Sequence, residues 1–360
     1  MEKVNLNLKG NSYEIVIDRK LLDKISLDLK KKPIGNRYLI ITDSNVKKLF
    51  GNKLLALMKK SNLQVDLISF KAGEQSKTLK TFEELIEKTQ KLGLDRKSAI
   101  IALGGGVVGD IAGFVAASYM RGINYVQVPT SLLAMIDSSI GGKVAVDKPK
   151  GKNMIGAFHQ PKKVYIDVSL LKNLPKKELI NGLAEIIKHA LIKDKTLFKY
   201  IKRNLNKILN KNETTLIELI KRNCEIKARI VEQDEKESGP RKLVNYGHTI
   251  GHALETLTNY KKYSHGEAIA IGMAVEALIA NKIGMLPKKE LTEQNTLLKK
   301  TGLSITVPKI DTNKIIQTLK KDKKVAGGKI EFVLLEKIGK AQYGIKTSNK
   351  IIRQAIEESK

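Results

Sequence analysis

SAIIALGGGVVGD, residues 98–110, joins a short apolar run to three consecutive glycines and a second apolar segment. The pattern predicts a buried strand, a tight turn and a helix, which is the unit where parallel sheets bind phosphate groups. Gly104, Gly106 and Gly109 satisfy the G-x-G-x-x-G spacing, but no acidic residue follows about 20 positions later to bind a ribose. Tight turns in any α/β domain use glycine for its backbone freedom. Residues 98–110 alone therefore leave dinucleotide binding open.

The segments around this turn extend the alternation of strands and helices. Residues 37–43, RYLIITD, form a second apolar run, and residues 78–93 between the two runs have helical spacing and a terminal glycine. This order predicts an α/β domain with a largely parallel sheet. Asp43, at the end of the earlier run, is the better candidate for a ribose contact. The first ten residues alternate apolar and polar side chains, as an edge strand does.

The second half of the chain has a different period. From about Lys176 onward, apolar residues recur at helical spacing over residues 176–192, 214–232, 246–257 and 266–284. We therefore expect an α/β domain over residues 1–170 and a helical domain over residues 171–360, with the boundary between Val168 and Pro175. At 360 residues and 42% hydrophobic content, the chain is large enough for two apolar cores.

The charge is strongly positive. The net charge of +29 comes from 66 Lys and Arg against 37 Asp and Glu, a balance found in nucleic-acid-binding proteins. The lysines are scattered along the whole chain, tryptophan is absent and aromatic residues make up only 5%, so base-stacking surfaces would be scarce. We expect a solvated lysine-rich surface that attracts a small anionic substrate, and no nucleic-acid partner.

Membrane association and disulfides are not expected either. No run of about 18 apolar residues occurs, and the first residues do not resemble the core of a signal peptide. We predict a soluble cytoplasmic protein. The single cysteine, Cys224, lies in a helical pattern, where its expected role is packing.

Two glycine-rich segments carry polar residues suited to binding an anion. Residues 135–147 contain Asp137 and Lys143, and residues 150–161 contain Lys152 and Asn153. Glycine-rich loops can hold lysines inside a cleft rather than on a helix exterior. In a chain this basic, a single lysine is more simply a surface residue, so the prediction depends on the combination of both segments.

The helical half contains three candidate ligand motifs. Glu185 and Lys188 are three residues apart on one helix, where a simple ion pair is the default interpretation. His248 and His252 are four apart, so both could reach one metal ion, although the spacing does not require it. The glutamate that follows the first histidine in metalloproteases is replaced by Thr249.

A third histidine stands at a predicted helix start. Ser264 and Glu267 form a capping box, so Glu267 is more simply a cap than a catalyst, and His265 falls at the first helical position. The positive end of the helix disfavours an imidazolium, and the neutral imidazole binds metals. Two histidines with one carboxylate would form the three-ligand set of a catalytic zinc site.

Together these motifs resemble one enzyme family. The strings GGGVVGDIAGFVAASYMRGINYVQVPTSLLAMIDSSIGGK, GKNMIGAFHQP, NGLAEIIKHA, RKLVNYGHTIGHALE and HGEAIAIGM, in this order, are similar to those of 3-dehydroquinate synthases. The similarity is dense from about Ile101 to Ile283. It is looser in the first hundred residues and in the tail, where DKKVAGGKIEFVLL is still similar.

The resemblance implies a fold and a reaction. It implies a Rossmann-like NAD-binding domain, a helical domain carrying a divalent metal (zinc, or alternatively cobalt) and substrate, and a homodimer. The implied lyase reaction converts 3-deoxy-D-arabino-heptulosonate 7-phosphate to 3-dehydroquinate and phosphate in the shikimate pathway of aromatic amino acid biosynthesis. It proceeds through transient oxidation by NAD, phosphate elimination, re-reduction and intramolecular aldol closure.

The resemblance also assigns roles to individual residues. The implied metal ligands are Glu185, His248 and His265. The implied catalytic and substrate-binding residues are Asp137, Lys143, Lys152, Asn153, Lys188, Arg241, Asn245 and His252, with Lys323 in a lysine run whose register is ambiguous. The implied cofactor-binding residues are Asp43, Glu74, Lys77, Gly105, Gly106, Asp110, Thr130 and Ser131, together with Asp137, Lys143 and Lys152. Arg121 matches an arginine that reaches the neighbouring subunit, and Asn173 stands where a threonine is expected near the nucleotide.

Three other functions remain as alternatives. Another sugar-phosphate cyclase, such as a 2-deoxy-scyllo-inosose synthase, would share the fold, NAD and the metal. Those relatives tend to carry glutamate at the position of His252, and their substrates lack the carboxylate that Arg241 would bind. A metal-dependent polyol dehydrogenase would release NADH at each turnover, and a nucleic-acid-binding protein would use the basic surface.

Overall fold

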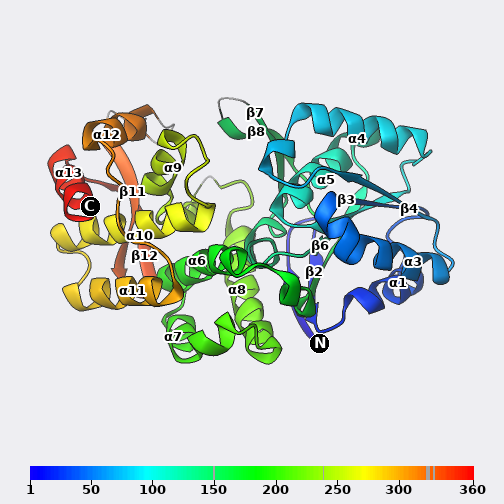
Figure 1. The fold of residues 1–360 in the computed structure, drawn as a ribbon, viewed down its shortest axis with the longest axis horizontal. Coiled ribbons are helices and arrows are strands. Elements are labelled where there is room, and N and C mark those ends of the chain that lie inside the picture. The colour runs from blue at the N-terminus through cyan, green and yellow to red at the C-terminus, as the bar shows by residue number, and fades with distance from the viewer. Residues whose placement is uncertain (149–150, 238, 322–324, 327–328) are drawn as a thin grey trace. The chain divides into compact units, whose positions relative to one another are not determined.

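The computed structural model describes residues 1–148, 151–237, 239–321, 325–326 and 329–360 (Figure 1). The chain divides into two compact units. The first contains Met1–Leu174 and Leu216–Glu232, and the second contains Pro175–Thr215 and Gln233–Lys360. Within the described residues, no helix is both long and apolar enough to cross a bilayer.

A seven-stranded sheet is the centre of the first unit. Its strand order is β1-β2-β9-β6-β5-β3-β4, and every neighbouring pair is parallel except β1 with β2. This confirms the predicted parallel α/β architecture and the edge strand at the start of the chain. The strands are β1 Glu2–Leu6, β2 Tyr13–Asp18, β3 Tyr38–Asp43, β4 Val65–Phe70, β5 Ala99–Gly104, β6 Asn124–Pro129 and β9 Lys163–Asp167.

Helices cover both faces of this sheet. Figure 1 shows α4 and α5 on one face and α1 and α3 on the other. Ile100, Ile101 and Leu103 of β5 are all fully buried, as expected for a strand covered on both faces. The helices are α1 Leu22–Lys31, α2 Ser44–Val46, α3 Asn52–Lys60, α4 Leu79–Lys91 and α5 Gly106–Ser118, with single turns η1 Lys47–Gly51, η2 Glu74–Ser76, η3 Tyr119–Arg121, η4 Ala134–Ser138 and η5 Val168–Asn173.

The two glycine-rich segments differ from the predicted loops. They form an antiparallel hairpin of β7 Lys143–Lys148 and β8 Gly151–Phe158. Val144 and Val146 are buried, and Val144 packs against Gly113 of α5, where a Cβ would lie 2.4 Å from the valine side chain. The loop prediction was wrong because glycine in these segments allows the two strands to pack closely. A Cβ on Gly156 of β8 would lie 2.1 Å from the carbonyl oxygen of Val144 in β7.

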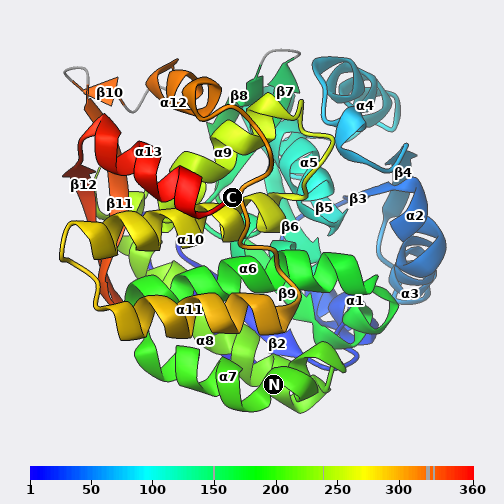
Figure 2. The same ribbon diagram turned by 60° about the vertical axis from the view of Figure 1, so that its left-hand side comes forward.

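The second unit is mainly helical. Figure 2 shows α6, α10 and α11 side by side, and α10 also contacts α9 and α13. Thirteen of the 18 residues of α10 are buried, so this helix lies at the core of the unit. The helices are α6 Lys176–Lys193, α7 Lys195–Leu209, α9 His248–Leu257, α10 His265–Lys282, α11 Lys288–Thr301, α12 Thr312–Lys321 and α13 Asn349–Glu358, with the turn η6 Pro240–Asn245.

A small sheet adds to the helices of the second unit. The strands β10 Val325–Ala326, β11 Lys329–Lys337 and β12 Lys340–Lys346 pair in that order. An all-helical second domain was therefore an incomplete expectation. The apolar residues Phe332, Val333, Leu334 and Leu335 are all buried, and Gly339, with φ of +92°, makes the turn between β11 and β12.

Helix α8, Glu213–Gln233, modifies the expected single boundary near residue 170. Its residues 216–232 group with the first unit, although the chain on both sides belongs to the second. The physical reason is direct contact: Asn223 donates to the carbonyl of Ile136 at 2.8 Å, and Lys227 Nζ lies 2.6 Å from Asp137 Oδ1. Cys224, on the same helix, is fully buried, which confirms its packing role.

Candidate functional site

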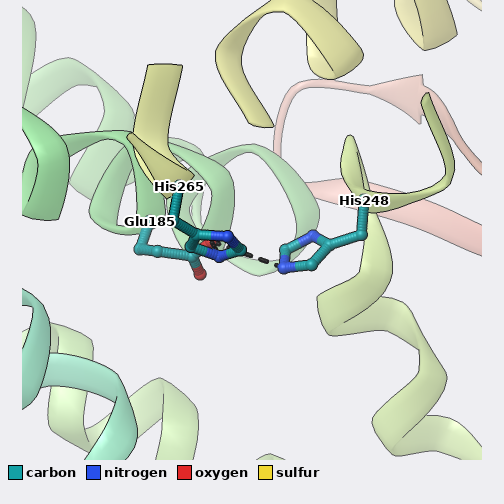
Figure 3. Close-up of side chains that lie close together, drawn as sticks. All are labelled: Glu185, His248 and His265. Atoms are coloured by element: carbon teal, nitrogen blue, oxygen red, sulfur yellow. Dashed lines mark ion pairs between the residues drawn. The ribbon is translucent and has the colours of Figure 1, made fainter. Parts of the chain in front are cut away.

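Three side chains from three helices of the second unit converge on one point (Figure 3). Glu185 comes from the middle of α6, and His248 and His265 are the first residues of α9 and α10. His248 Nε2 and His265 Nε2 each lie 3.6 Å from Glu185 Oε1, and one ligand atom from each residue lies within 4.8 Å of the others. Two ligands bound tetrahedrally to one ion at about 2.0–2.2 Å lie roughly 3.4 Å apart. The 3.6 Å separation between Glu185 Oε1 and each histidine Nε2 therefore suits the binding of one cation by all three side chains.

Local contacts determine where the two histidine-bearing helices begin. Glu267 accepts a hydrogen bond from the Ser264 backbone at 2.7 Å, which confirms the predicted capping box and the position of His265 as the first helical residue. The next amide, of Gly266, donates to Asn181 Oδ1 on α6 at 2.6 Å. This bond ties the start of α10 to the helix that carries Glu185.

The start of α9 is held by a buried carboxylate. Glu276 of α10 is fully buried and accepts hydrogen bonds from the amides of Gly247 at 2.7 Å and Ile250 at 3.3 Å. Gly247 has φ of +80°, a conformation that glycine adopts without strain. His248 follows directly, so its backbone position is determined by the contact between α9 and α10.

Each histidine uses its second ring nitrogen for another contact. His248 Nδ1 lies 3.1 Å from the carbonyl oxygen of Tyr246, and His265 Nδ1 lies 3.4 Å from Glu255 Oε1. When Nδ1–H donates to such an acceptor, Nε2 keeps the lone pair that binds a metal. Both rings therefore present Nε2 toward Glu185.

The two imidazoles differ in their affinity for protons. Burial, followed by the nearby Lys188 charge, holds the pKa of His248 well below its usual value, which favours the neutral ligand form. Burial also acts to lower the pKa of His265, but hydrogen bonds and attraction to Glu185 and Glu255 outweigh burial and raise it to about 9. The expectation that the helix terminus keeps His265 neutral overlooked Glu185 and Glu255, which favour the protonated ring in the metal-free protein.

The other predicted residues of the second unit lie on α6, η6 and α9. Lys188 is buried and forms the i,i+3 ion pair with Glu185 that the spacing predicts. Arg241 is 2% exposed, and its backbone amide donates to Asp234 Oδ2 at 3.1 Å. The remaining two are more accessible. Asn245 donates to Glu237 Oε1 at 2.9 Å, and His252, with a 42% exposed side chain, lies 4.0 Å from Glu255 Oε2.

In the first unit, the predicted cofactor residues follow the carboxyl ends of neighbouring parallel strands. Gly105 and Gly106 follow β5, and Thr130 and Ser131 follow β6. The chain moves from β3 outward to β4 and then returns to β5 on the other side of β3, so the strand order reverses here. Ligands of open α/β sheets bind at such a reversal. A Cβ on Gly105 would lie 3.5 Å from Ser131 Oγ, so the two turns are adjacent.

Asp43 ends β3 at the same edge. Its Oδ1 accepts hydrogen bonds from the amides of Asn45 at 2.8 Å and Val46 at 2.9 Å, which makes it the N-cap of α2. A contact from Asp43 to a ribose remains a prediction.

Lys77 connects two further predicted residues of the first unit. Its ammonium lies 2.6 Å from Asp110 Oδ2 and donates to the side-chain oxygen of Asn153. Burial acts to lower the pKa of Lys77, but attraction to Asp110 outweighs burial and raises it. Burial raises the pKa of Asp110 to about 6, with Lys77 opposing that shift. Near neutral pH both groups are therefore mainly charged.

The lysines of the hairpin lie at its start and in β8. Lys143 is exposed at the first position of β7. Lys152 Nζ lies 2.9 Å from Glu74 Oε1, with both side chains partly exposed. Arg121 ends η3 with φ of +71°, and Asn173 ends η5. Lys323 lies outside the described residues.

Several residues at these sites were not predicted from the sequence. In the first unit, Lys227 pairs with Asp137, and Asp147 Oδ1 accepts from the Asn153 amide at 2.7 Å. In the second unit, Glu255 contacts His265 and Glu276 holds the start of α9. A signal existed for Glu255 alone, since it follows His252 by three residues on the same helix.

Comparisons with known proteins find similar sequences over nearly the whole chain. Residues 67–181 match the family model described as 3-dehydroquinate synthase N-terminal, and residues 182–325 match 3-dehydroquinate synthase C-terminal. The chain is 49% identical to a 3-dehydroquinate synthase of Thermoanaerobacter pseudethanolicus, covering 95% of this chain and 96% of that protein. It is 45% identical to the 3-dehydroquinate synthase of Thermodesulfovibrio yellowstonii, covering 99% of this chain and 100% of that protein.

Solved structures share the fold over almost the whole chain. A 2-epi-5-epi-valiolone synthase from Streptomyces hygroscopicus, with NAD⁺ and Zn²⁺ bound, has a TM-score of 0.90 at 28% identity, covering 98% of each chain. A 2-deoxy-scyllo-inosose synthase complexed with carbaglucose-6-phosphate, NAD⁺ and Co²⁺ has a TM-score of 0.88 at 28% identity, covering 100% of each chain. The identity to proteins named 3-dehydroquinate synthase is far higher and extends over nearly the full chain, so this chain belongs to the 3-dehydroquinate synthase family.

Proposed function

We propose that the chain catalyses the conversion of 3-deoxy-D-arabino-heptulosonate 7-phosphate to 3-dehydroquinate and phosphate, as a lyase that uses NAD and a divalent metal. The observation that carries the proposal is the convergence of Glu185, His248 and His265 in a chain 45–49% identical to enzymes of that name. A carboxylate and two imidazoles are the donor set of a catalytic zinc site that retains an open position for substrate.

The metal would be held by Glu185 Oε1 and by Nε2 of His248 and His265. When bound, zinc or cobalt supplies a Lewis acid that polarises a substrate hydroxyl. Lys188 contributes from the chain itself: its buried ammonium pairs with Glu185 and adds positive charge beside the ligand set. A substrate oxygen that gains negative charge would be stabilised at this point.

NAD would bind at the carboxyl edge of the sheet, where Gly105 and Gly106 begin α5 and Thr130 and Ser131 follow β6. The amides at the start of α5 face outward at the positive end of a helix, which suits a pyrophosphate. When bound, NAD supplies a hydride acceptor and returns the hydride within the same turnover. Glu74, Lys77 and Asp110 are assigned to cofactor binding on the basis of the family resemblance and the ion pair between Lys77 and Asp110.

The remaining polar residues would hold the anionic groups of the substrate. Lys152, Asn153 and Arg241 are assigned to its phosphate and carboxylate, and Asp137, Lys143 and Asn245 to its orientation. His252 is more exposed than the ligand histidines and would hydrogen-bond the substrate or relay a proton. The family resemblance implies that the leaving phosphate helps to take its own proton, so positioning would supply much of the rate.

We also infer a cytoplasmic homodimer in which Arg121 reaches the site of the neighbouring subunit. The supporting observation is an exposed turn: Met120 is 43% exposed, and Met120 and Arg121 have positive φ of 50° and 71°. Such conformations cost energy in residues other than glycine and are often retained for function. Sedimentation of the purified protein would test the dimer, and loss of activity in Arg121→Ala with retained dimerisation would test the role of the arginine.

The deciding experiment is incubation of the protein with NAD, Zn²⁺ or Co²⁺, and the heptulosonate phosphate. We expect phosphate and dehydroquinate to form in equal amounts with no accumulation of NADH. Steady accumulation of NADH would indicate a dehydrogenase instead. Glucose 6-phosphate is the matched control, because turnover of this sugar would favour the inosose synthase alternative.

A further inference from the structure

One face of α9 carries three side chains that lie close to the proposed metal site. His248, His252 and Glu255 occupy positions i, i+4 and i+7 of this helix, so their side chains lie on one side of it. His248 faces Glu185, whereas Glu255 faces His265 of the neighbouring helix α10. Glu255 has no role in the function proposed above.

The contacts of Glu255 divide between its two carboxylate oxygens. Oε1 lies 3.4 Å from His265 Nδ1, and Oε2 lies 4.0 Å from His252 Nε2. Glu255 is 4% exposed but the His252 side chain is 42% exposed, so water screens the contact with His265 less than the contact with His252. One buried carboxylate therefore lies between a proposed metal ligand and a proposed substrate-binding histidine.

The contact with His265 has a chemical consequence for the ring. The imidazole has two nitrogens, and a proton held on Nδ1 by Glu255 leaves Nε2 as the lone-pair donor, on the side of Glu185. A carboxylate acceptor also makes the imidazole a stronger base than a carbonyl acceptor does, so Nε2 donates more strongly to a cation. His248 has the carbonyl of Tyr246 in the equivalent place. The Nδ1 atoms of the two proposed ligand histidines therefore have different acceptors: a carboxylate for His265 and a backbone carbonyl for His248.

We propose that Glu255 is a positioning residue of the metal centre: it orients His265, selects its metal-binding tautomer and holds His252 beside it. The inference rests on the proposed metal site. Glu255 is assigned a supporting role because its Oε1 faces Nδ1 of His265, whereas His248 and His265 both present Nε2 to Glu185. His252, Glu255 and His265 form a second group that could hold a metal ion, and the Co²⁺ spectrum described below distinguishes the two arrangements. Partners of this kind change metal affinity by about 10- to 100-fold when they are removed.

The test measures metal affinity without substrate or NAD. Wild-type protein, Glu255→Gln and Glu255→Ala are titrated with Zn²⁺ against a chromophoric chelator, and the thermal unfolding of each metal-free protein is recorded. Glu267→Gln is the matched control, since it makes the same change only two residues from His265, and glutamine also functions in a capping box. We expect the affinity to fall about 10- to 100-fold in Glu255→Gln and at least as far in Glu255→Ala. Glu267→Gln should stay within about twofold of wild type, well below the loss expected from a ligand-supporting residue.

The absorption spectrum of the Co²⁺-loaded protein separates positioning from ligation. In a positioning role, Glu255→Gln loaded with excess Co²⁺ keeps the visible bands of the wild-type protein, because the ligand set is unchanged. Changed bands would show that Glu255 is itself a ligand and would overturn the proposal, as would an affinity of Glu255→Gln within about twofold of wild type. If Glu255→Ala does not fold, the glutamine variant decides.

A result that overturns the proposed metal site can be distinguished from a result that overturns only the role of Glu255. If wild-type protein binds neither Zn²⁺ nor Co²⁺ at the site, or if His248→Ala binds them equally well, the proposed function loses its metal and the role of Glu255 is overturned with it. If wild-type protein binds metal and Glu255→Gln binds it equally well, only the positioning role is overturned.

Discussion

A Cβ atom on Gly272 would lie 1.9 Å from the carbonyl oxygen of Gly247, so α9 and α10 approach each other at a point where only glycine fits. Gly247 immediately precedes His248, and Glu276, one turn beyond Gly272, accepts the Gly247 amide. The close approach of the two helices therefore positions His248, a proposed metal ligand.

The first prediction follows from this contact. Gly272→Ala should separate the start of α9 from α10, lower the free energy of unfolding by about 1–3 kcal/mol and weaken metal binding. Urea unfolding and Zn²⁺ titration measure the two effects. Gly105→Ala is the control for folding and metal, because its Cβ would make only an ordinary 3.5 Å contact. Wild-type metal affinity in Gly272→Ala would contradict the prediction.

The second prediction separates two histidines on one helix. His248→Ala should lose bound metal and activity together, since His248 Nε2 lies 3.6 Å from Glu185. His252→Ala should keep its metal, because that ring lies outside the three-ligand set, and should lose about 10²-fold or more in turnover. Metal analysis beside steady-state kinetics makes the comparison. Loss of metal from His252→Ala would show that both histidines ligate, and full activity would show that His252 has no catalytic part.

The third prediction concerns Lys152. Its ion pair with Glu74 is partly exposed, so Lys152→Ala should change the free energy of unfolding by less than about 1 kcal/mol. Loss of a charged hydrogen bond to the substrate should lower kcat/KM by about 10- to 100-fold. Lys3→Ala removes a comparable exposed pair with Glu14 and should leave activity unchanged. Activity of Lys152→Ala within a few-fold of wild type would remove this lysine from the anion site.

The fourth prediction is a pH effect on stability. Asp28 accepts hydrogen bonds from Lys163, at 2.6 Å, and from Tyr165. Burial acts to raise the pKa of Asp28, but these bonds outweigh burial and hold it below its usual value. A lowered carboxyl pKa adds stability above the unfolded pKa of about 3.9, and this stability is lost as the pH falls through the folded value.

Asp28→Asn should therefore be less stable than wild type at pH 5–7, by less than about 1 kcal/mol because the carboxylate is 35% exposed. The difference should shrink below about pH 4. Urea unfolding across this range measures it, with Glu83→Gln on α4 as a surface control. An equal difference at pH 3 and pH 7 would mean that the charge of Asp28 is not its source.

The fifth prediction concerns the net charge of +29. If the lysines and arginines that carry this charge lie on a solvated surface, binding to DNA or RNA should be weak, independent of sequence and lost steeply with added salt. Fluorescence anisotropy at several salt concentrations tests this. Tight binding to one sequence at physiological salt would establish a nucleic-acid partner.

Patterns that depend on neighbours along the chain were predictable. The strand, turn and helix of residues 98–118 form as expected because burial on both sides of β5 requires a continuous apolar run and the turn requires glycine. The capping box at Ser264 formed as predicted because its bonds join residues only three apart. The identity of the three metal-site candidates came from the family resemblance, since spacing alone left His248 and His252 equivalent.

Contacts between distant segments were decided only by the tertiary structure. The sequence does not reveal that Lys227 pairs with Asp137, 90 positions away, or that α8 thereby groups with the α/β unit. Nor does it reveal that Glu255 and Glu185 both contact His265 and raise its pKa, against the effect of the helix terminus. Propensity, capping and periodicity act over a few residues, whereas burial and charge pairing depend on which surfaces the completed fold brings together. For this reason the sequence indicated the parallel sheet, the main helices and the candidate site residues, and the packing of three helices decided how His248 and His265 are oriented toward Glu185.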